Sequence, residues 1–185
     1  MSYGPPSYAS RPGPGLLSRH DGEPCGLDEV VDGFICYAHH DYKMLEVFKR
    51  HLDANKQVGG VSYWADPHIR GGQKWRPEIA KAIDQAQVFL LLLSAAFAMS
   101  DYIRYTERPA IEARAAGCNG LIVPVILNSF IWEPHVGRLQ ALPIANGRLK
   151  PVDRWGGHDR GVTAAHQQLL DAIHAHWPAP IGVSP

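Results

Sequence analysis

The segment that most constrains the fold is Val88 to Leu93, six consecutive apolar residues with the sequence VFLLLL. A strand with one face toward water alternates apolar and polar side chains, whereas a strand covered on both faces can be apolar throughout. Even with the apolar residues that continue after Ser94, the stretch is too short to cross a bilayer as a helix. It therefore predicts the central strand of a parallel sheet, and no membrane span.

On both sides of this segment, short apolar runs alternate with stretches of helical periodicity. Further strands are predicted at 33–38, 61–64 and 121–127, with a weak edge strand near 149–152. Helices are predicted between them, the third over about 103–116 and the last over about 161–176. Repeated strand–helix units dictate a three-layer α/β domain with its functional crevice at the carboxyl ends of the strands.

The chain has 185 residues, the size of one domain. Residues 1–29 and 178–185 are rich in proline and glycine and too poor in apolar residues to offset the entropy of ordering. We therefore expect a flexible leader over 1–29, a folded domain over 30–177, and a flexible tail over 178–185. That tail would also suit the start of a linker to a missing domain.

Charge and cysteine content exclude several classes of function. Because 18 Lys and Arg balance 18 Asp and Glu, no broad basic face for nucleic acid is expected. The three cysteines have no CxxC spacing, and the N-terminal residues lack a signal core, which favours a cytoplasmic location. The C-terminal histidines are spaced wrongly for a single ion, so no metal site is expected.

The loops after the predicted strands hold the candidate functional residues. The turn after the first strand has no glycine, which excludes a dinucleotide fingerprint and a P-loop there. The second loop gathers two indoles, a carboxylate and two basic side chains: Trp64, Asp66, His68, Arg70 and Trp75. On the residues alone, two interpretations stay open, namely packing and turn bracing or contact with a ligand.

The third helix carries one carboxylate of interest, Glu107. Ser100 or Asp101 is a good N-cap for this helix, and Glu107 follows with Ile103 four residues before it and Ile111 four residues after it. Glu107 thus shares a face with two apolar residues and should be partly desolvated. Spacing alone also allows an ordinary helix-surface charge, whose replacement should leave the fold intact.

Five segments, in order along the chain, match a known pattern. They are FICYAHHD (34–41); Trp64-Ala65-Asp66 with Ile69, Gly72 and Trp75; Leu92-Leu93-Ser94 with SDYI (100–103) and ERPA (107–110); IVPVIL (122–127); and Trp132 with LQALP (139–143). Over about 33–176 the chain resembles bacterial TIR (Toll/interleukin-1 receptor) domains of the NAD-consuming type. The resemblance implies a three-layer flavodoxin-like fold, with a five-stranded parallel sheet and helices on both faces.

The resemblance also implies a function. Many bacterial and plant TIR domains cleave the nicotinamide–ribose bond of NAD+, releasing nicotinamide and ADP-ribose or a cyclic ADP-ribose. They are activated by self-assembly, act in antiphage defence, and are frequently joined to a sensor domain. NAD+ is then a substrate, and no cofactor is expected. The alternative is a non-catalytic interaction module, as many animal TIR domains are.

Residue roles follow from the matching positions. Glu107 occupies the place of the catalytic glutamate. The implied substrate-binding residues are Phe34, Tyr37, Ala38, Trp64, Asp66, Arg70, Trp75, Ser100, Tyr102 and Ile103, and the implied assembly loop contains His68, Ile69, Gly71 and Gly72. The sequence departs from the family at Ile103, where many TIR enzymes have tryptophan, and at Arg108, where leucine is frequent.

Overall fold

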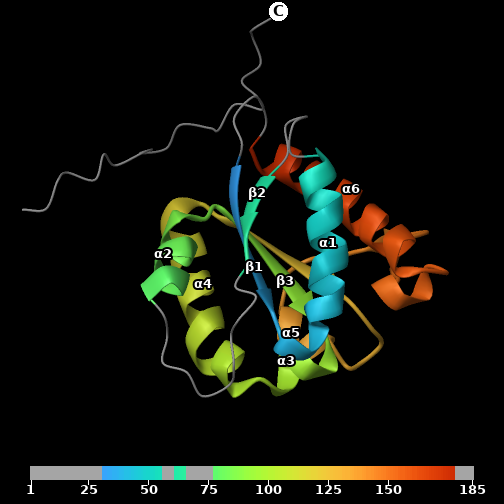
Figure 1. Cartoon of the computed structure of the whole chain (residues 1–185), viewed down its shortest axis with the longest axis horizontal. Coiled ribbons are helices and arrows are strands. Elements are labelled where there is room, and N and C mark those ends of the chain that lie inside the picture. The colour runs from blue at the N-terminus through green and yellow to red at the C-terminus, as the bar shows by residue number, and fades with distance from the viewer. Residues whose placement is uncertain (1–30, 56–60, 66–76, 178–185) are drawn as a thin grey trace, which may run out of the picture.

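The centre of the protein is a parallel sheet, seen in the computed structural model, which describes residues 31–55, 61–65 and 77–177 (Figure 1). Its strands are β1 (Val31–Tyr37), β2 (Val61–Trp64), β3 (Val88–Leu93) and β4 (Leu121–Ile126), in the spatial order β2-β1-β3-β4. This is the order of the first four strands of a flavodoxin-like sheet. The predicted leader and tail lie outside the described residues.

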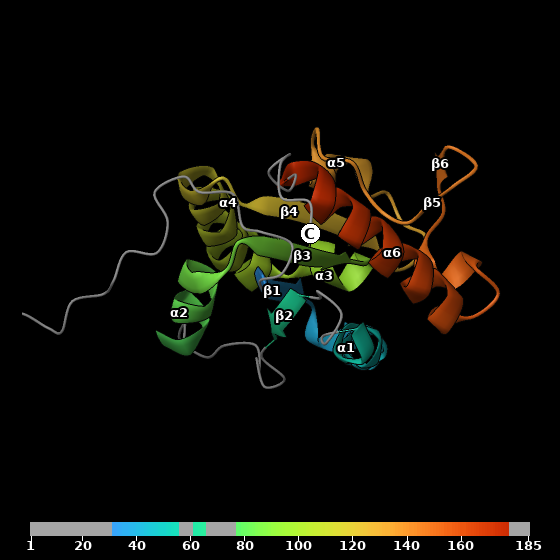
Figure 2. The ribbon, with the colours of Figure 1, turned by 90° about the horizontal axis from the view of Figure 1, so that it is seen from above.

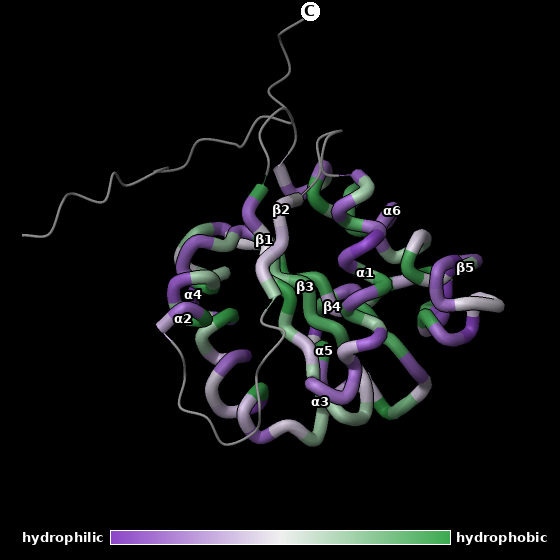
Figure 3. The backbone as a smooth tube through the Cα atoms, in the orientation of Figure 1, coloured by the Kyte–Doolittle hydropathy of each residue, from purple (hydrophilic) through white to green (hydrophobic). Residues whose placement is uncertain are grey.

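Helices cover both faces of the sheet, as Figures 1 and 2 show. One face carries α1 (Tyr42–Asn55) and α6 (His158–His176), and the other carries α2 (Pro77–Gln85) and α4 (Arg108–Cys118). Alternate residues of β3 enter the two cores, with Leu90 and Leu92 facing α1 and α6 and Leu91 and Leu93 facing the other layer. The three-layer α/β prediction is confirmed, and Figure 3 shows the central strand β3 in the hydrophobic colour.

Shorter elements complete the described part of the chain. They are η1 (His39–Asp41), α3 (Ala95–Met99), the π-helical turn η2 (Ile103–Glu107), α5 (Glu133–Val136), β5 (Ile144–Ala145), β6 (Arg148–Leu149) and η3 (Val152–Arg154). Across the described ranges, every helix is too short or too polar to cross a membrane.

Within the described residues the parallel sheet has four strands instead of the expected five, and beyond β4 it continues only as a single parallel bridge between Val125 and Leu142. Two backbone hydrogen bonds of 2.8 Å join Leu142 to the β4 segment. The ladder ends there because both backbone groups of Ile144 bond to the side-chain amide of Gln168 on α6, at 2.8 and 2.9 Å. Pro143, between them, has no N–H to donate.

The predicted edge strand at 149–152 is wrong. Leu149 belongs to β6, which pairs antiparallel with β5, and Val152 already begins η3. Asn146 and Gly147 join the two strands with φ values of 49° and 73°. Positive φ at both central residues is the requirement of a tight type I′ hairpin turn. The β5–β6 hairpin thus takes the place of the predicted edge strand of the main sheet.

Candidate active site

A cavity of about 590 Å³ opens at the carboxyl ends of β1 and β3, where the sequence predicted the functional crevice. Its lining comes from the β1–η1 turn, α3 and the η2 segment: Tyr37, Ala38, His39, His40, Ala96, Met99, Ser100, Tyr102, Ile103 and Glu107. Volumes of this size are typical of small-molecule sites. Among the lining side chains, Glu107 is the carboxylate.

Glu107 is almost completely buried, with 1% of its surface exposed. Ile103 and Ile111, four residues to either side, are 3% and 0% exposed, so the three residues share an inward face as predicted. The alternative of a helix-surface charge is wrong. Replacing Glu107 therefore alters a packed position, and a substitution of the same shape is the appropriate test.

The predicted third helix is divided by the π turn η2. The backbone N–H of Arg108 bonds to the carbonyl of Ile103, five residues earlier, instead of the usual four. The cause is Pro109, which has no N–H to give to the carbonyl of Tyr105 and whose ring crowds that carbonyl. Widening the turn relieves the crowding, and Glu107 ends the widened turn at the cavity.

The N-cap of this segment is Ser100, one of the two predicted candidates. Its Oγ accepts the backbone N–H of Ile103 at 3.3 Å. Ser100 also lines the cavity, so the residue that starts the helix contributes to the site. A cap with this geometry stabilises a helix by about 1 kcal/mol.

A buried contact that the sequence analysis missed joins β1 to Glu107. The Cys36 thiol donates to Oε2 of Glu107 across 3.3 Å, and Cys36 is 0% exposed. Burial, then the charge of Glu107 and the hydrogen bond to it, raise the pKa of the Cys36 thiol well above its usual value. Strand alternation gave a signal for this contact, because residue 36 shares its sheet face with Ala38, which was predicted to line the site.

A second missed contact ties together the loops on either side of the cavity. Ser94, at the end of β3, donates its hydroxyl to Oδ2 of Asp41 at 2.5 Å and accepts the N–H of Phe97 at 3.0 Å. Burial raises the pKa of Asp41, although the Ser94 hydrogen bond and the charge of His40 act in the opposite direction. Ser94 thus fixes the β1–η1 turn against the first turn of α3.

The structure brings together six of the predicted site residues in this cavity: Tyr37, Ala38, Ser100, Tyr102, Ile103 and Glu107. The lining residues that sequence reasoning omitted are His39, His40, Ala96 and Met99. Seven predicted residues lie outside the described part of the chain: Asp66, His68, Ile69, Arg70, Gly71, Gly72 and Trp75. Their predicted roles in substrate binding and assembly stay predictions.

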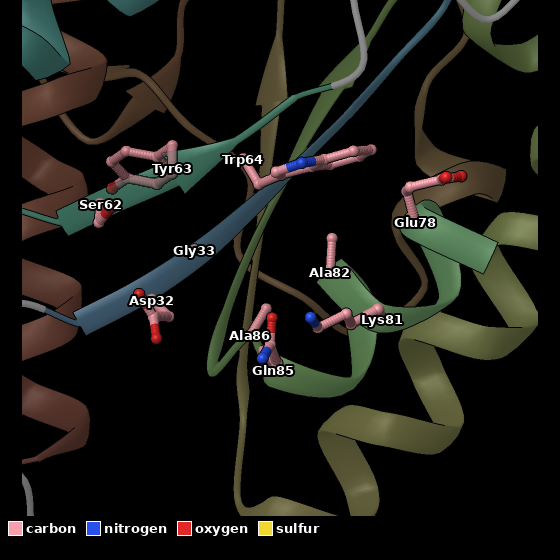
Figure 4. Close-up of a pocket in the computed structure, with 10 residues that line it drawn as sticks. All are labelled: Asp32, Gly33, Ser62, Tyr63, Trp64, Glu78, Lys81, Ala82, Gln85 and Ala86. Atoms are coloured by element: carbon pink, nitrogen blue, oxygen red, sulfur yellow. The ribbon is translucent and has the colours of Figure 1, made fainter. Parts of the chain in front are cut away.

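Phe34 and Trp64 do not line the cavity. Phe34 is 1% exposed and stacks on Trp64, with ring centroids 5.5 Å apart and ring planes 14° from parallel. Trp64 faces a separate cavity of about 460 Å³ between β2 and α2. Figure 4 shows its indole extending from β2 toward Glu78. For both rings this placement favours packing over direct contact with a ligand in the cavity of Glu107.

Arg108, the family departure next to Glu107, forms an ion pair along its own helix. Its Nε bonds Oε1 of Glu112 at 2.7 Å, in the i to i+4 arrangement. Its charge still acts on the buried pair, since it lowers the pKa of Cys36 against the larger opposing effects. In the described ranges, no three His, Cys, Asp or Glu side chains are grouped so that they could hold a metal ion.

Comparison with known families shows to which protein family this chain belongs. A family model described as a TIR domain matches residues 34–170, which include the second half of β1, the Glu107 segment and most of α6. The chain belongs to the TIR domain family. TIR domains commonly self-associate, and the family includes members that cleave NAD+.

A curated relative is also similar to this TIR domain. It is the uncharacterized protein y4lF of Sinorhizobium fredii (strain NBRC 101917 / NGR234), 29% identical over 140 residues. The matched region is 75% of this chain and 42% of y4lF, so the chain spans less than half the length of that relative. The likeness adds no activity to the family assignment.

Proposed function

We propose that this TIR domain cleaves the nicotinamide–ribose bond of NAD+, giving nicotinamide and ADP-ribose or a cyclic ADP-ribose. The observation that carries the proposal is a buried carboxylate, Glu107, on the wall of a cavity with the volume of a small-molecule site. Tyr37 and Tyr102 line the same cavity and offer aromatic surfaces for the nicotinamide or adenine rings.

The chemistry of NAD+ explains why one carboxylate suffices. Nicotinamide leaves as a neutral ring from a cationic substrate, so no second carboxyl group has to protonate it, unlike an ordinary glycoside. The ribose develops positive charge at its anomeric carbon as the bond breaks. An ionised Glu107 beside that carbon stabilises the charge, most strongly where water is excluded.

Hydrolysis balances as NAD+ plus water giving nicotinamide, ADP-ribose and a proton. The nicotinamide nitrogen takes the electron pair of the broken bond, and the water oxygen forms the new bond to the anomeric carbon. The released proton passes to Glu107 or to solvent. Cyclisation differs only in that an atom of the substrate itself takes the place of water, and the geometry of the cavity sets which one reaches the carbon first.

Self-assembly is part of the proposal. We infer that the domain is weakly active alone and gains activity when clustered, through the predicted assembly loop that contains His68, Ile69, Gly71 and Gly72. In that setting the protein is a cytoplasmic effector of antiphage defence, switched on by a fused or partner sensor that assembles it.

The test is loss of NAD+ over time with the full chain, dilute and then clustered on a surface. Glu107→Gln keeps the shape of this buried side chain and removes its charge, and should lower turnover at least about a hundredfold. Glu46→Gln is the matched control, because Glu46 lies on α1, on the opposite face of the sheet, in an exposed pair with Lys49. Thermal unfolding of each variant verifies that the fold survives.

Three outcomes are informative. Turnover that rises on clustering and disappears in Glu107→Gln alone supports the proposal. Turnover that persists in Glu107→Gln removes Glu107 from the mechanism. Absence of turnover in both states of the unmodified chain overturns the enzyme proposal in favour of a non-catalytic interaction module.

A further inference from the structure

Cys36 lies at the centre of the sheet, where its position is fixed. It pairs with Leu91 in the parallel ladder between β1 and β3 and is 0% exposed. The next two residues of the chain, Tyr37 and Ala38, line the cavity. The thiol therefore contacts Glu107 from the central strand β1, and the next residue along that strand already lines the cavity.

In the hydrogen bond between the two groups the thiol is the donor and the carboxylate the acceptor. A carboxylate has no proton to give, and burial beside Glu107 keeps the thiol protonated by raising the pKa of Cys36. Cys36 therefore acts as a donor toward an ionised Glu107, and its Sγ lies 3.3 Å from Oε2 of Glu107. With 0% and 1% of the two residues exposed, bulk water has little access to compete for this bond.

The contact matters because the backbone alone does not fix a glutamate carboxylate. Glu107 closes the π turn η2, and its long side chain can rotate about several bonds. A donor from β1, 71 residues away in sequence, restricts that rotation from outside the helix. A hydrogen bond to the ionised form of an acid also favours that form over the protonated one.

On the basis of the proposed function of Glu107, we propose that Cys36 is a positioning residue, whose thiol orients the Glu107 carboxylate at the cavity and favours its ionised form. Among the described residues, the other titratable groups that line the cavity are Tyr37, His39, His40 and Tyr102, and Arg108 acts on the buried pair by its charge. All of these groups are present in every variant of Cys36. A difference in titration between Cys36→Ser and Cys36→Ala is therefore assigned to the donor at position 36.

The test compares two substitutions in the full chain that differ by one hydroxyl group. Cys36→Ser keeps a donor in the place of the thiol, whereas Cys36→Ala removes the donor and leaves its space empty. We expect Cys36→Ala to lower kcat about five- to tenfold with KM unchanged, the scale of losing one hydrogen bond to a charge. The acid limb of its pH–rate profile should move to higher pH. Cys36→Ser should stay within about twofold of the unmodified chain in kcat.

A second measurement needs no turnover. Carbon-13 NMR of the side-chain carboxyl groups, with the Glu107 signal identified by its loss in Glu107→Gln, follows the titration of this group directly. Its midpoint should rise in Cys36→Ala and return toward the unmodified value in Cys36→Ser. Cys118→Ala, at the half-buried thiol that ends α4, is the control and should leave the midpoint unchanged.

The outcomes separate this proposal from the proposed function. Equal midpoints in the unmodified chain, Cys36→Ala and Cys36→Ser overturn the role of Cys36, whether or not NAD+ is cleaved. A shifted midpoint without any turnover supports the contact and overturns the enzyme proposal instead. If Cys36→Ala fails to fold, the near-isosteric pair Cys36→Thr and Cys36→Val repeats the comparison of a hydroxyl donor with none.

Discussion

Replacing Ser94 by alanine should destabilise the protein and loosen the rim of the cavity. Ser94 is 1% exposed, and its hydroxyl makes both the hydrogen bond to Asp41 and the N-cap bond to Phe97. Alanine at this position removes both bonds, leaving a half-buried carboxylate and a helix N–H without this partner. The β1–η1 turn and α3, which the hydroxyl links, then lose their direct connection.

The size of the effect follows from the two bonds. Losing an N-cap hydroxyl costs about 1 kcal/mol. A hydrogen bond to a charged group contributes roughly 1.5–3 kcal/mol when buried, but water can replace part of it at a half-buried carboxylate, and we take about 1 kcal/mol. The sum, about 2 kcal/mol, lowers the melting temperature of a domain of this size by roughly 4–8 °C.

Urea unfolding of the unmodified chain, Ser94→Ala, Asp41→Asn and the double variant measures both the loss and the coupling between the two side chains. We expect coupling of about 1 kcal/mol. Since the Ser94 bond lowers the pKa of Asp41 against the effect of burial, its removal raises that pKa further. The deficit of Ser94→Ala should therefore shrink as pH falls and Asp41 becomes protonated. A loss below about 0.5 kcal/mol, or zero coupling, would refute this reasoning.

Other predictions concern α6. A Cβ at Gly161 would lie 2.5 Å from the carbonyl oxygen of Val152, so Gly161→Ala should cost about 2 kcal/mol in urea unfolding; a neutral result would mean that η3 moves freely. Burial lowers the pKa of His166, so the contribution of this residue to stability should be constant above about pH 6.5 and fall below it, because the unfolded chain takes up the proton first. His166→Gln should make the loss of stability below about pH 6.5 smaller, and an unchanged dependence of stability on pH would contradict this prediction. Gln168→Leu, which removes both bonds to the backbone of Ile144, should cost about 1–2 kcal/mol in urea unfolding, and an unchanged free energy of unfolding would show that these bonds add nothing to stability.

The parts of the fold that depend on local pattern were predictable from the sequence. β2 and β3 have the bounds that were predicted, because short runs rich in β-branched, aromatic and leucine residues carry their own strand signal. The inward face of Glu107 was predictable for the same reason, since Ile103 and Ile111 flank it at helical spacing. The cavity at the strand ends followed from parallel topology.

The features that depend on tertiary contacts were not predictable. Cys36 and Glu107 are 71 residues apart, and their contact depends on how the helix segment sits on the sheet. Pro109 signalled a disturbed helix, but the sequence does not say whether a helix kinks, ends or widens there. The β5–β6 hairpin is a different case, because Asn146-Gly147 is a strong hairpin signal in the sequence itself.

The π turn before Glu107 also bears on how this sequence is aligned with its relatives. A turn closed from residue i to i+5 contains one residue more than the ordinary α-turn spanning the same place. Relatives with a regular helix here would carry one residue fewer, and an alignment drawn without a gap through 103–107 would shift one flank by one position. Deleting one exposed residue of the turn, such as Tyr105 at 67% exposure, should return the two flanks to the phase of a regular helix, although Pro109 would still give no N–H to the preceding turn. The π turn can thus take up a length difference of one residue between relatives without moving Glu107 away from the cavity.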